Sequence, residues 1–81
     1  MDGFEYRFVE GLEDGGIAQA IRAAEGRLVA EVLEMEPTMG IVSVDIGSGI
    51  VADVYVEDEG VDYVEFSVNG CLVGELVQEG F

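Results

Sequence analysis

Apolar and polar residues alternate along several stretches of the chain, beginning with "FEYRFVE" at residues 4–10. Successive side chains of an extended strand point to opposite faces, so this alternation predicts a half-buried strand. Four further strand-like runs follow, at residues 41–46, 50–57, 61–68 and 71–78. The breaks between them, "GSG", "DEG" and "NG", are typical of hairpin turns. The second half of the chain is therefore predicted to be an antiparallel meander of four strands.

Between the first strand and the meander, the apolar residues change to a helical spacing. They form one stripe: Ile17, Ile21, Ala24, Leu28, Val32 and Met35. Asp14 is the expected N-cap, and Pro37 ends the helix because the residue before a proline is disfavoured in the helical region. We expect one α+β domain, residues 1–81, in which one amphipathic helix packs on one face of an antiparallel sheet in the order β-α-β-β-β-β.

Counting back from the turns predicts how the strands pair. With loops of three, three and two residues, the facing pairs are Ile46 with Ile50, Glu57 with Val61, and Val68 with Cys71. One face of the sheet is then almost entirely apolar and is the expected core: Val42, Val44, Ile46, Ile50, Ala52, Val54, Val56, Val64, Phe66, Val68, Cys71, Val73 and Val77. Asp62 and Glu75 lie toward one end of this face.

The other face mixes carboxylates with tyrosines and aliphatic residues. The same count predicts three adjacent rows across it: Ser43, Asp53, Glu65 and Gly74; then Ile41, Tyr55, Tyr63 and Leu76; and on the other side Asp45, Val51, Ser67 and Leu72. Glu57, Asp58 and Glu59 extend the acid to the end of the sheet. Like charges directly opposite one another destabilise a sheet, so the facing of Asp53 and Glu65 needs an explanation.

Two explanations are open. Antiparallel sheets commonly expose one face to solvent, and Arg7 would neutralise the pair if the first strand lay alongside. Alternatively, the face binds a partner. Carboxylates two residues apart on a strand are about 6.7 Å apart and cross-strand partners about 5 Å, which is of the same order as the spacing of charges along a nucleic-acid backbone. Tyrosines add rigid contact area. The predicted partner-binding residues are Asp45, Asp53, Tyr55, Glu57, Asp58, Glu59, Tyr63 and Glu65.

The charge of the chain restricts its partners. Eighteen acidic residues stand against three basic ones, all arginine, which gives a net charge of −15 in 81 residues. A charge this large destabilises the compact state through self-repulsion and repels nucleic acid and anionic membranes. A basic protein surface, cations or a very salty medium are compatible surroundings. We therefore expect a basic, nucleic-acid-binding protein as partner, and no direct contact with nucleic acid or membrane.

The residue types that most enzymes need are missing. With no histidine and no lysine there is no imidazole base, no Schiff base and no P-loop. Cys71 is placed in the core, where thiols are inert, and "VEDEG" lacks the twelve-residue calcium-loop pattern. We expect a non-enzymatic protein without cofactor or metal. A single cysteine and the lack of an 18-residue apolar run or a signal peptide predict a cytoplasmic protein.

In its general character the chain resembles the small acidic phage proteins that mimic DNA, including several anti-CRISPR proteins. The resemblance rests on the short length, the absence of lysine and the acidic run "VYVEDEGVDYVE", and it includes no shared motif. It implies an inhibitor in the host cytoplasm that docks on the basic channel of a CRISPR effector or a similar nuclease and blocks access of DNA.

Two alternatives concern self-association and salt. The back of the predicted helix carries Gly26 and Ala30 four residues apart, beside Ala23 and Leu33, and this surface would allow the close helix–helix approach of a twofold dimer. The acidic composition would also suit a small self-associating structural protein adapted to high salt, and then the charge would say nothing about partners. Against this, glutamate outnumbers aspartate and the core residues are large and branched.

Overall fold

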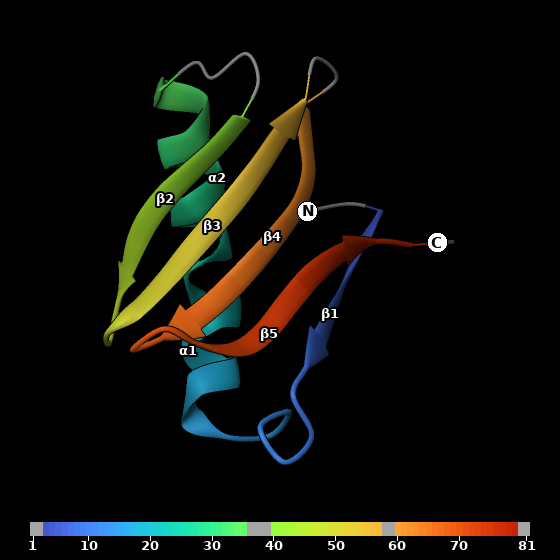
Figure 1. Ribbon diagram of the computed structural model, residues 1–81, viewed down its shortest axis with the longest axis vertical. Coiled ribbons are helices and arrows are strands. Elements are labelled where there is room, and N and C mark those ends of the chain that lie inside the picture. Colours follow the sequence, from blue (N-terminus) through green and yellow to red (C-terminus); the bar gives the residue numbers. More distant parts are fainter. Residues whose placement is uncertain (1–2, 36–39, 58–59, 80–81) are drawn as a thin grey trace.

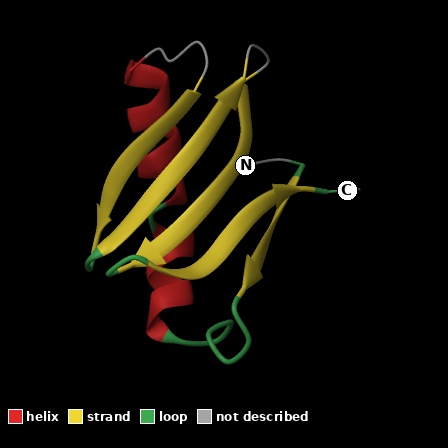
Figure 2. Ribbon diagram, viewed as in Figure 1, coloured by secondary structure: helices red, strands yellow, loops and turns green. Residues whose placement is uncertain are grey.

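The computed structural model describes residues 3–35, 40–57 and 60–79. Within these residues, a five-stranded antiparallel sheet is covered on one face by two consecutive helices (Figures 1 and 2). The elements in chain order are β1 (Phe4–Phe8), α1 (Gly16–Ala23), α2 (Glu25–Met35), β2 (Gly40–Gly47), β3 (Ile50–Glu57), β4 (Gly60–Val68) and β5 (Cys71–Gln78). The α+β class is confirmed, with the helical segment between the first strand and the meander.

The prediction of a single helix is wrong, because the described helical segment divides into α1 and α2 at Ala24. The Ala24 N–H donates to the carbonyls of both Ala20 (3.1 Å) and Ile21 (3.2 Å), and the Leu28 N–H donates to the Ala24 carbonyl at 2.9 Å. The backbone hydrogen bonding of the two helices therefore continues through a tighter turn at Ala24, and the apolar residues of both helices stay on the side that faces the sheet. Ile21, Leu28 and Val32 are buried as predicted.

The start of α1 also differs from the prediction. Its N-cap is Gly15, with extended backbone (φ −85°, ψ 177°) and no side-chain capping bond, rather than Asp14. Two turns close the preceding loop, through hydrogen bonds from the Leu12 N–H to the Val9 carbonyl (2.9 Å) and from the Gly15 N–H to the Leu12 carbonyl (3.3 Å). Asp14 lies in the second turn and is exposed.

The strands are ordered β1-β5-β4-β3-β2, which places β1 at one edge beside β5 and β2 at the other edge. In the centre of the sheet the predicted register is confirmed, because Asp53 pairs with both Ser43 and Glu65. The predicted pairing of Val68 with Cys71 is also confirmed. The sequence left the position of β1 open, and in the structure two strands, β5 and β4, separate it from β3 and Asp53.

Near the first two turns the register shifts by one residue. Gly47 pairs with Ile50, and Glu57 pairs with Gly60. Both glycines have positive φ (93° and 113°), a conformation that glycine adopts without the steric cost other residues would have. The loops are thus two residues long, and the pairings that this overturns are Ile46 with Ile50 and Glu57 with Val61.

A second irregularity moves Glu75 out of the core. The register of β4 and β5 shifts between Phe66 and Ser67, leaving one extra residue in β5. Beyond the shift, Leu76 is 1% exposed on the core side, and Glu75 pairs with Glu65 on the opposite face. The predicted outward position of Leu76 and inward position of Glu75 are both wrong. Burying an unpaired carboxylate is costly, whereas burying a leucine is favourable.

Asp62 leaves the core face in the same way. Tyr55 pairs with Tyr63, but the next pair along is Val56 with Val61, so Asp62 is skipped by the ladder. Asp62 is exposed, and Val61 packs against the core. Both acids predicted on the apolar face are therefore removed from it by an irregularity in the strand pairing.

The core lies between the helices and the sheet. Its buried members are Ile21, Leu28, Val32, Val44, Ile46, Ile50, Ala52, Val54, Val56, Val64, Phe66, Val73 and Leu76. Cys71 is exposed, contrary to its predicted burial, and Val77 is only half-buried. Gly74 is buried under the ring of Phe8, not placed on the outer face, and a Cβ there would lie 2.7 Å from Phe8 Cδ1.

Candidate functional site: the outer face of the sheet

A line of polar side chains crosses all five strands on the face that the helices leave uncovered. Successive cross-strand partners are Arg7 on β1, Glu75 on β5, Glu65 on β4, Asp53 on β3 and Ser43 on β2. The three carboxylates in the middle are here called the acid row. Because cross-strand partners stand about 5 Å apart, the acid row places three negative charges on adjacent strands. The predicted facing of Asp53 and Glu65 is confirmed, and Glu75 is a third member that counting from the turns missed.

Each carboxylate of the acid row has a hydroxyl group from the preceding strand beside it. Ser43 Oγ donates to Asp53 Oδ1 (2.6 Å), Tyr55 Oη donates to Glu65 Oε1 (3.1 Å), and the Tyr63 hydroxyl interacts with the Glu75 carboxylate. Hydrogen bonds to an ionised acceptor are stronger than those between neutral groups. The hydroxyl groups thus offset part of the repulsion between the facing acids without neutralising their charge.

Tyr55 and Tyr63 form a neutral aromatic pair beside the acid row. Their ring centroids are 5.2 Å apart with the planes tilted by 54°. The hydrogen bond to Glu65 raises the pKa of Tyr55, and burial, followed by the hydrogen bond to Glu75, raises the pKa of Tyr63. A phenol ordinarily ionises near pH 10, so both hydroxyls remain protonated donors at neutral pH.

The positive side chains are engaged elsewhere. Arg7 pairs with Glu5 (2.9 Å), Arg27 pairs with Glu31 (3.1 Å), and Arg22 lies over the rings of Tyr6 and Phe8. Although Arg7 is the cross-strand partner of Glu75, its guanidinium turns to Glu5 on its own strand. Among the residues that the structure describes, no ion pair joins an arginine to the acid row.

The other predicted partner-binding residues are not part of this cluster. Asp45 Oδ1 accepts a hydrogen bond from the Gly47 N–H at 2.8 Å, so its carboxylate closes the turn after β2. Glu57 is exposed at the opposite end of β3. Asp58 and Glu59 lie outside the described residues. The structure therefore brings together Asp53, Tyr55, Tyr63 and Glu65, joined by Ser43 and Glu75.

The predicted dimer face is on the solvent side of the helices. Ala23, Gly26 and Ala30 are exposed, and the side chain of Leu33 lies outside what the structure describes. Within the described ranges, no group of three acidic or cysteine side chains is placed to hold a metal ion. In the same ranges, no helix is long and apolar enough to cross a membrane.

Comparisons with protein-family models, with curated proteins and with solved structures find no match. The functional interpretation therefore depends on the geometry of the outer face.

Proposed function

We propose that this protein is a non-enzymatic acidic inhibitor that docks its outer face on the basic nucleic-acid-binding surface of another protein, such as a CRISPR-Cas effector, and blocks access of DNA. The observation that carries the proposal is the acid row: three carboxylates on adjacent strands with no arginine paired to them among the described residues. Arginine or lysine side chains of a partner would supply the missing counter-charges.

The hydroxyl bonds leave room for such a partner. A carboxylate has two oxygens and about four acceptor sites, and each hydroxyl donor occupies only one of these sites. Asp53, Glu65 and Glu75 therefore keep acceptor capacity toward solvent while their side chains are held in place by Ser43, Tyr55 and Tyr63. Side chains already held in position lose less conformational entropy when a partner binds.

Charge and aromatic area contribute in different ways. The net charge of −15 would steer the protein to a basic surface and raise the association rate at low salt. The Tyr55–Tyr63 pair is half-buried and rigid, and tyrosine is among the residues that contribute most to the free energy of binding at protein interfaces. The acids would set orientation and rate, and the tyrosines would slow dissociation.

A pull-down with this protein as bait, using a purified CRISPR effector at low and high salt, tests the proposal. Capture should weaken as salt rises and should be competed by DNA. The test variant carries Asp53→Asn, Glu65→Gln and Glu75→Gln. The matched control carries Glu10→Gln, Glu34→Gln and Glu79→Gln, which removes the same charge from exposed sites away from the acid row.

The test variant should lose capture and the control should keep it. Equal loss in both variants would show that net charge alone drives binding, and equal retention would show that the acid row is not the docking surface. The alternative, a self-associating protein adapted to high salt, makes a separate prediction. At about 0.1 M salt, charges closer together than about 10 Å still repel one another, so a salt-adapted protein unfolds there. The proposed inhibitor stays folded at the same salt concentration.

A further inference from the structure

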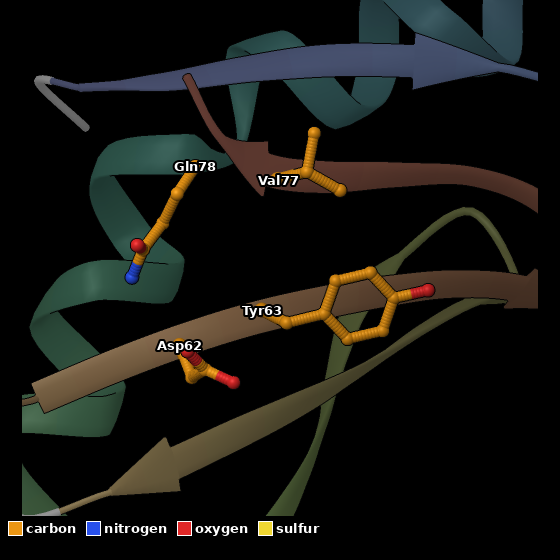
Figure 3. A pocket seen from close by; sticks show the side chains of 4 residues that line it. All are labelled: Asp62, Tyr63, Val77 and Gln78. Carbon is orange, nitrogen blue, oxygen red and sulfur yellow. The ribbon is translucent and has the colours of Figure 1, made fainter. Parts of the chain in front are cut away.

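The sheet opens between β4 and β5 at one end. Their pairing stops at Val64 and Leu76, while β5 continues along β1, with Val77 opposite Glu5. Figure 1 shows the two strands diverging beyond this point. A hollow of about 320 Å³ lies in the opening, lined by Asp62, Tyr63, Val77 and Gln78 (Figure 3). This volume is at the lower end of the range of about 300–1,000 Å³ for small-molecule sites, so it suits a single side chain or small group.

A smaller hollow adjoins the first. It has a volume of about 120 Å³, shares Asp62 and Gln78 with the larger one, and is otherwise lined by Glu57, Gly60 and Val61. Glu57 adds a second carboxylate on this side. The opening therefore has an aromatic and aliphatic wall at one side of Asp62 and an acidic wall at the other.

Among the residues that the structure describes, none supplies a counter-charge to Asp62. It is skipped by the strand pairing, it is exposed, and within the described residues no hydrogen bond or ion pair reaches its carboxylate. It is also separate from the acid row, in which Asp53 and Glu65 accept hydroxyl hydrogen bonds and Glu75 interacts with the Tyr63 hydroxyl. Asp62 thus differs from those acids both in position and in having no internal donor.

We propose that this hollow binds the guanidinium group of an arginine side chain from the basic partner. The inference rests on the proposed docking function and names the group that would enter this site. A guanidinium is planar and has five N–H donors, which match a carboxylate in a two-bond arrangement. Asp62 supplies that carboxylate, and the amide oxygen of Gln78 accepts a further N–H. In Figure 3 the Gln78 side chain extends from β5 toward β4.

The remaining two lining residues fit the rest of an arginine. The ring of Tyr63 offers a face on which a guanidinium stacks, and that ring packs against Tyr55, with the ring centroids 5.2 Å apart. Val77 offers an apolar surface to the methylene stem. Lysine would fit less well, because its ammonium is a compact charge that neither stacks nor binds a carboxylate through two parallel bonds.

The test is an NMR titration of the full chain with the blocked tripeptide acetyl-Gly-Arg-Gly-amide. Matched peptides carry citrulline, which has the same shape without the charge, or lysine in place of arginine. We expect saturable shifts at Asp62, Tyr63, Val77 and Gln78 with the arginine peptide, weaker ones with lysine, and none with citrulline. Asp62→Asn should weaken binding about tenfold, equivalent to about 1.4 kcal/mol. The control Glu34→Gln removes the same charge on α2 and should leave binding unchanged.

Three results would overturn the inference: shifts confined to the acid row, equal binding of citrulline, or an unchanged affinity after Asp62→Asn. The amide spectrum of each variant shows directly whether it remains folded. The pull-down separates this inference from the proposed function. Capture of the effector that is insensitive to Asp62→Asn rejects the arginine site and leaves the docking function standing. Arginine-peptide binding in the hollow without capture of any effector rejects the docking function alone.

Discussion

The two faces of the sheet are built from the same alternating pattern but are stabilised in different ways. On the inner face, branched apolar residues and Phe66 are removed from water by the helices, and the stabilisation follows from buried area. On the outer face, three carboxylates stand side by side, each with a hydroxyl donor from the neighbouring strand. The stabilisation of the inner face depends on the total apolar area that is buried. The stabilisation of the outer face depends on which side chains are cross-strand neighbours.

This difference shows why the two faces respond differently to a register shift. The extra residue in β5 exchanges Leu76 and Glu75 between the faces. The inner face gains one apolar side chain, Leu76. The outer face gains Glu75, which is the third acid of the acid row and the partner of Tyr63. The same shift therefore changes the core by one side chain but decides the composition of the candidate site.

The largest expected effect is in the core. Phe66 is 1% exposed, and Phe66→Ala should lower the free energy of unfolding by about 3–5 kcal/mol through lost burial and a residual cavity. Urea unfolding followed by far-UV circular dichroism measures this. The neighbouring outward substitution Ser67→Ala is the control and should change stability by less than about 0.5 kcal/mol. A cost below about 1 kcal/mol for Phe66→Ala would contradict the assignment of the inner face.

A smaller effect is expected where β1 packs on β5. In Gly74→Ala the new Cβ would lie 2.7 Å from Phe8 Cδ1, so the ring has to move. Overpacking of this kind should lower the free energy of unfolding by about 1–3 kcal/mol, measured in urea. In the control, Gly26→Ala, nothing lies within 4 Å of the new atom, and the change should stabilise the helix by about 0.5–1 kcal/mol. The two substitutions should change the free energy of unfolding in opposite directions. A change in the same direction would be evidence against the close contact between Gly74 and Phe8.

Alkaline pH tests both faces together. Burial and then the hydrogen bond to Glu25 raise the pKa of Tyr6 on the inner face, while the pKa values of Tyr55 and Tyr63 are raised on the outer face. The unfolded chain releases these protons near pH 10 and the folded chain only at higher pH. The contribution of these tyrosines to the free energy of unfolding should thus be fully present below about pH 10 and should be lost as the pH rises through their folded-state pKa values.

Tyrosinate absorbance and circular dichroism, recorded together against pH, measure this loss. Tyr6→Phe and Tyr63→Phe should each reduce the steepness of the alkaline loss of stability. Ionisation of all three tyrosines near pH 10 without loss of structure would contradict the hydrogen bonds assigned to them.

The smallest effect is expected on the outer face itself. Replacing Asp53, Glu65 and Glu75 by their amides removes facing like charges while keeping an acceptor for each hydroxyl. Relative to the control at Glu10, Glu34 and Glu79, this should raise the free energy of unfolding by less than about 1 kcal/mol at low salt. The gain should disappear as salt screens the charges. A loss of stability would show that the ionised row is a structural requirement of the fold.

Much of the architecture follows from local patterns in the sequence. The helical stripe through Ile21, Leu28 and Val32, the turn at Asn69–Gly70 and the facing of Asp53 with Glu65 were all predictable. Each depends on the period of a helix or strand, or on the φ angles that a turn requires. Even the errors had a visible signal, because Asp62 and Glu75 were the only two acids on the predicted core face.

What the sequence by itself determined is the α+β class, a helical segment between the first strand and the meander, and the central register, because these follow from short-range periodicity. Only the tertiary structure decided where the ladder skips a residue, which strand β1 joins and how β4 and β5 separate. A strand has a period of two, so one extra residue exchanges the faces of everything beyond it. Whether that residue is accommodated depends on the burial of the whole sheet, and this made Glu75 part of the acid row and left Asp62 in the opening.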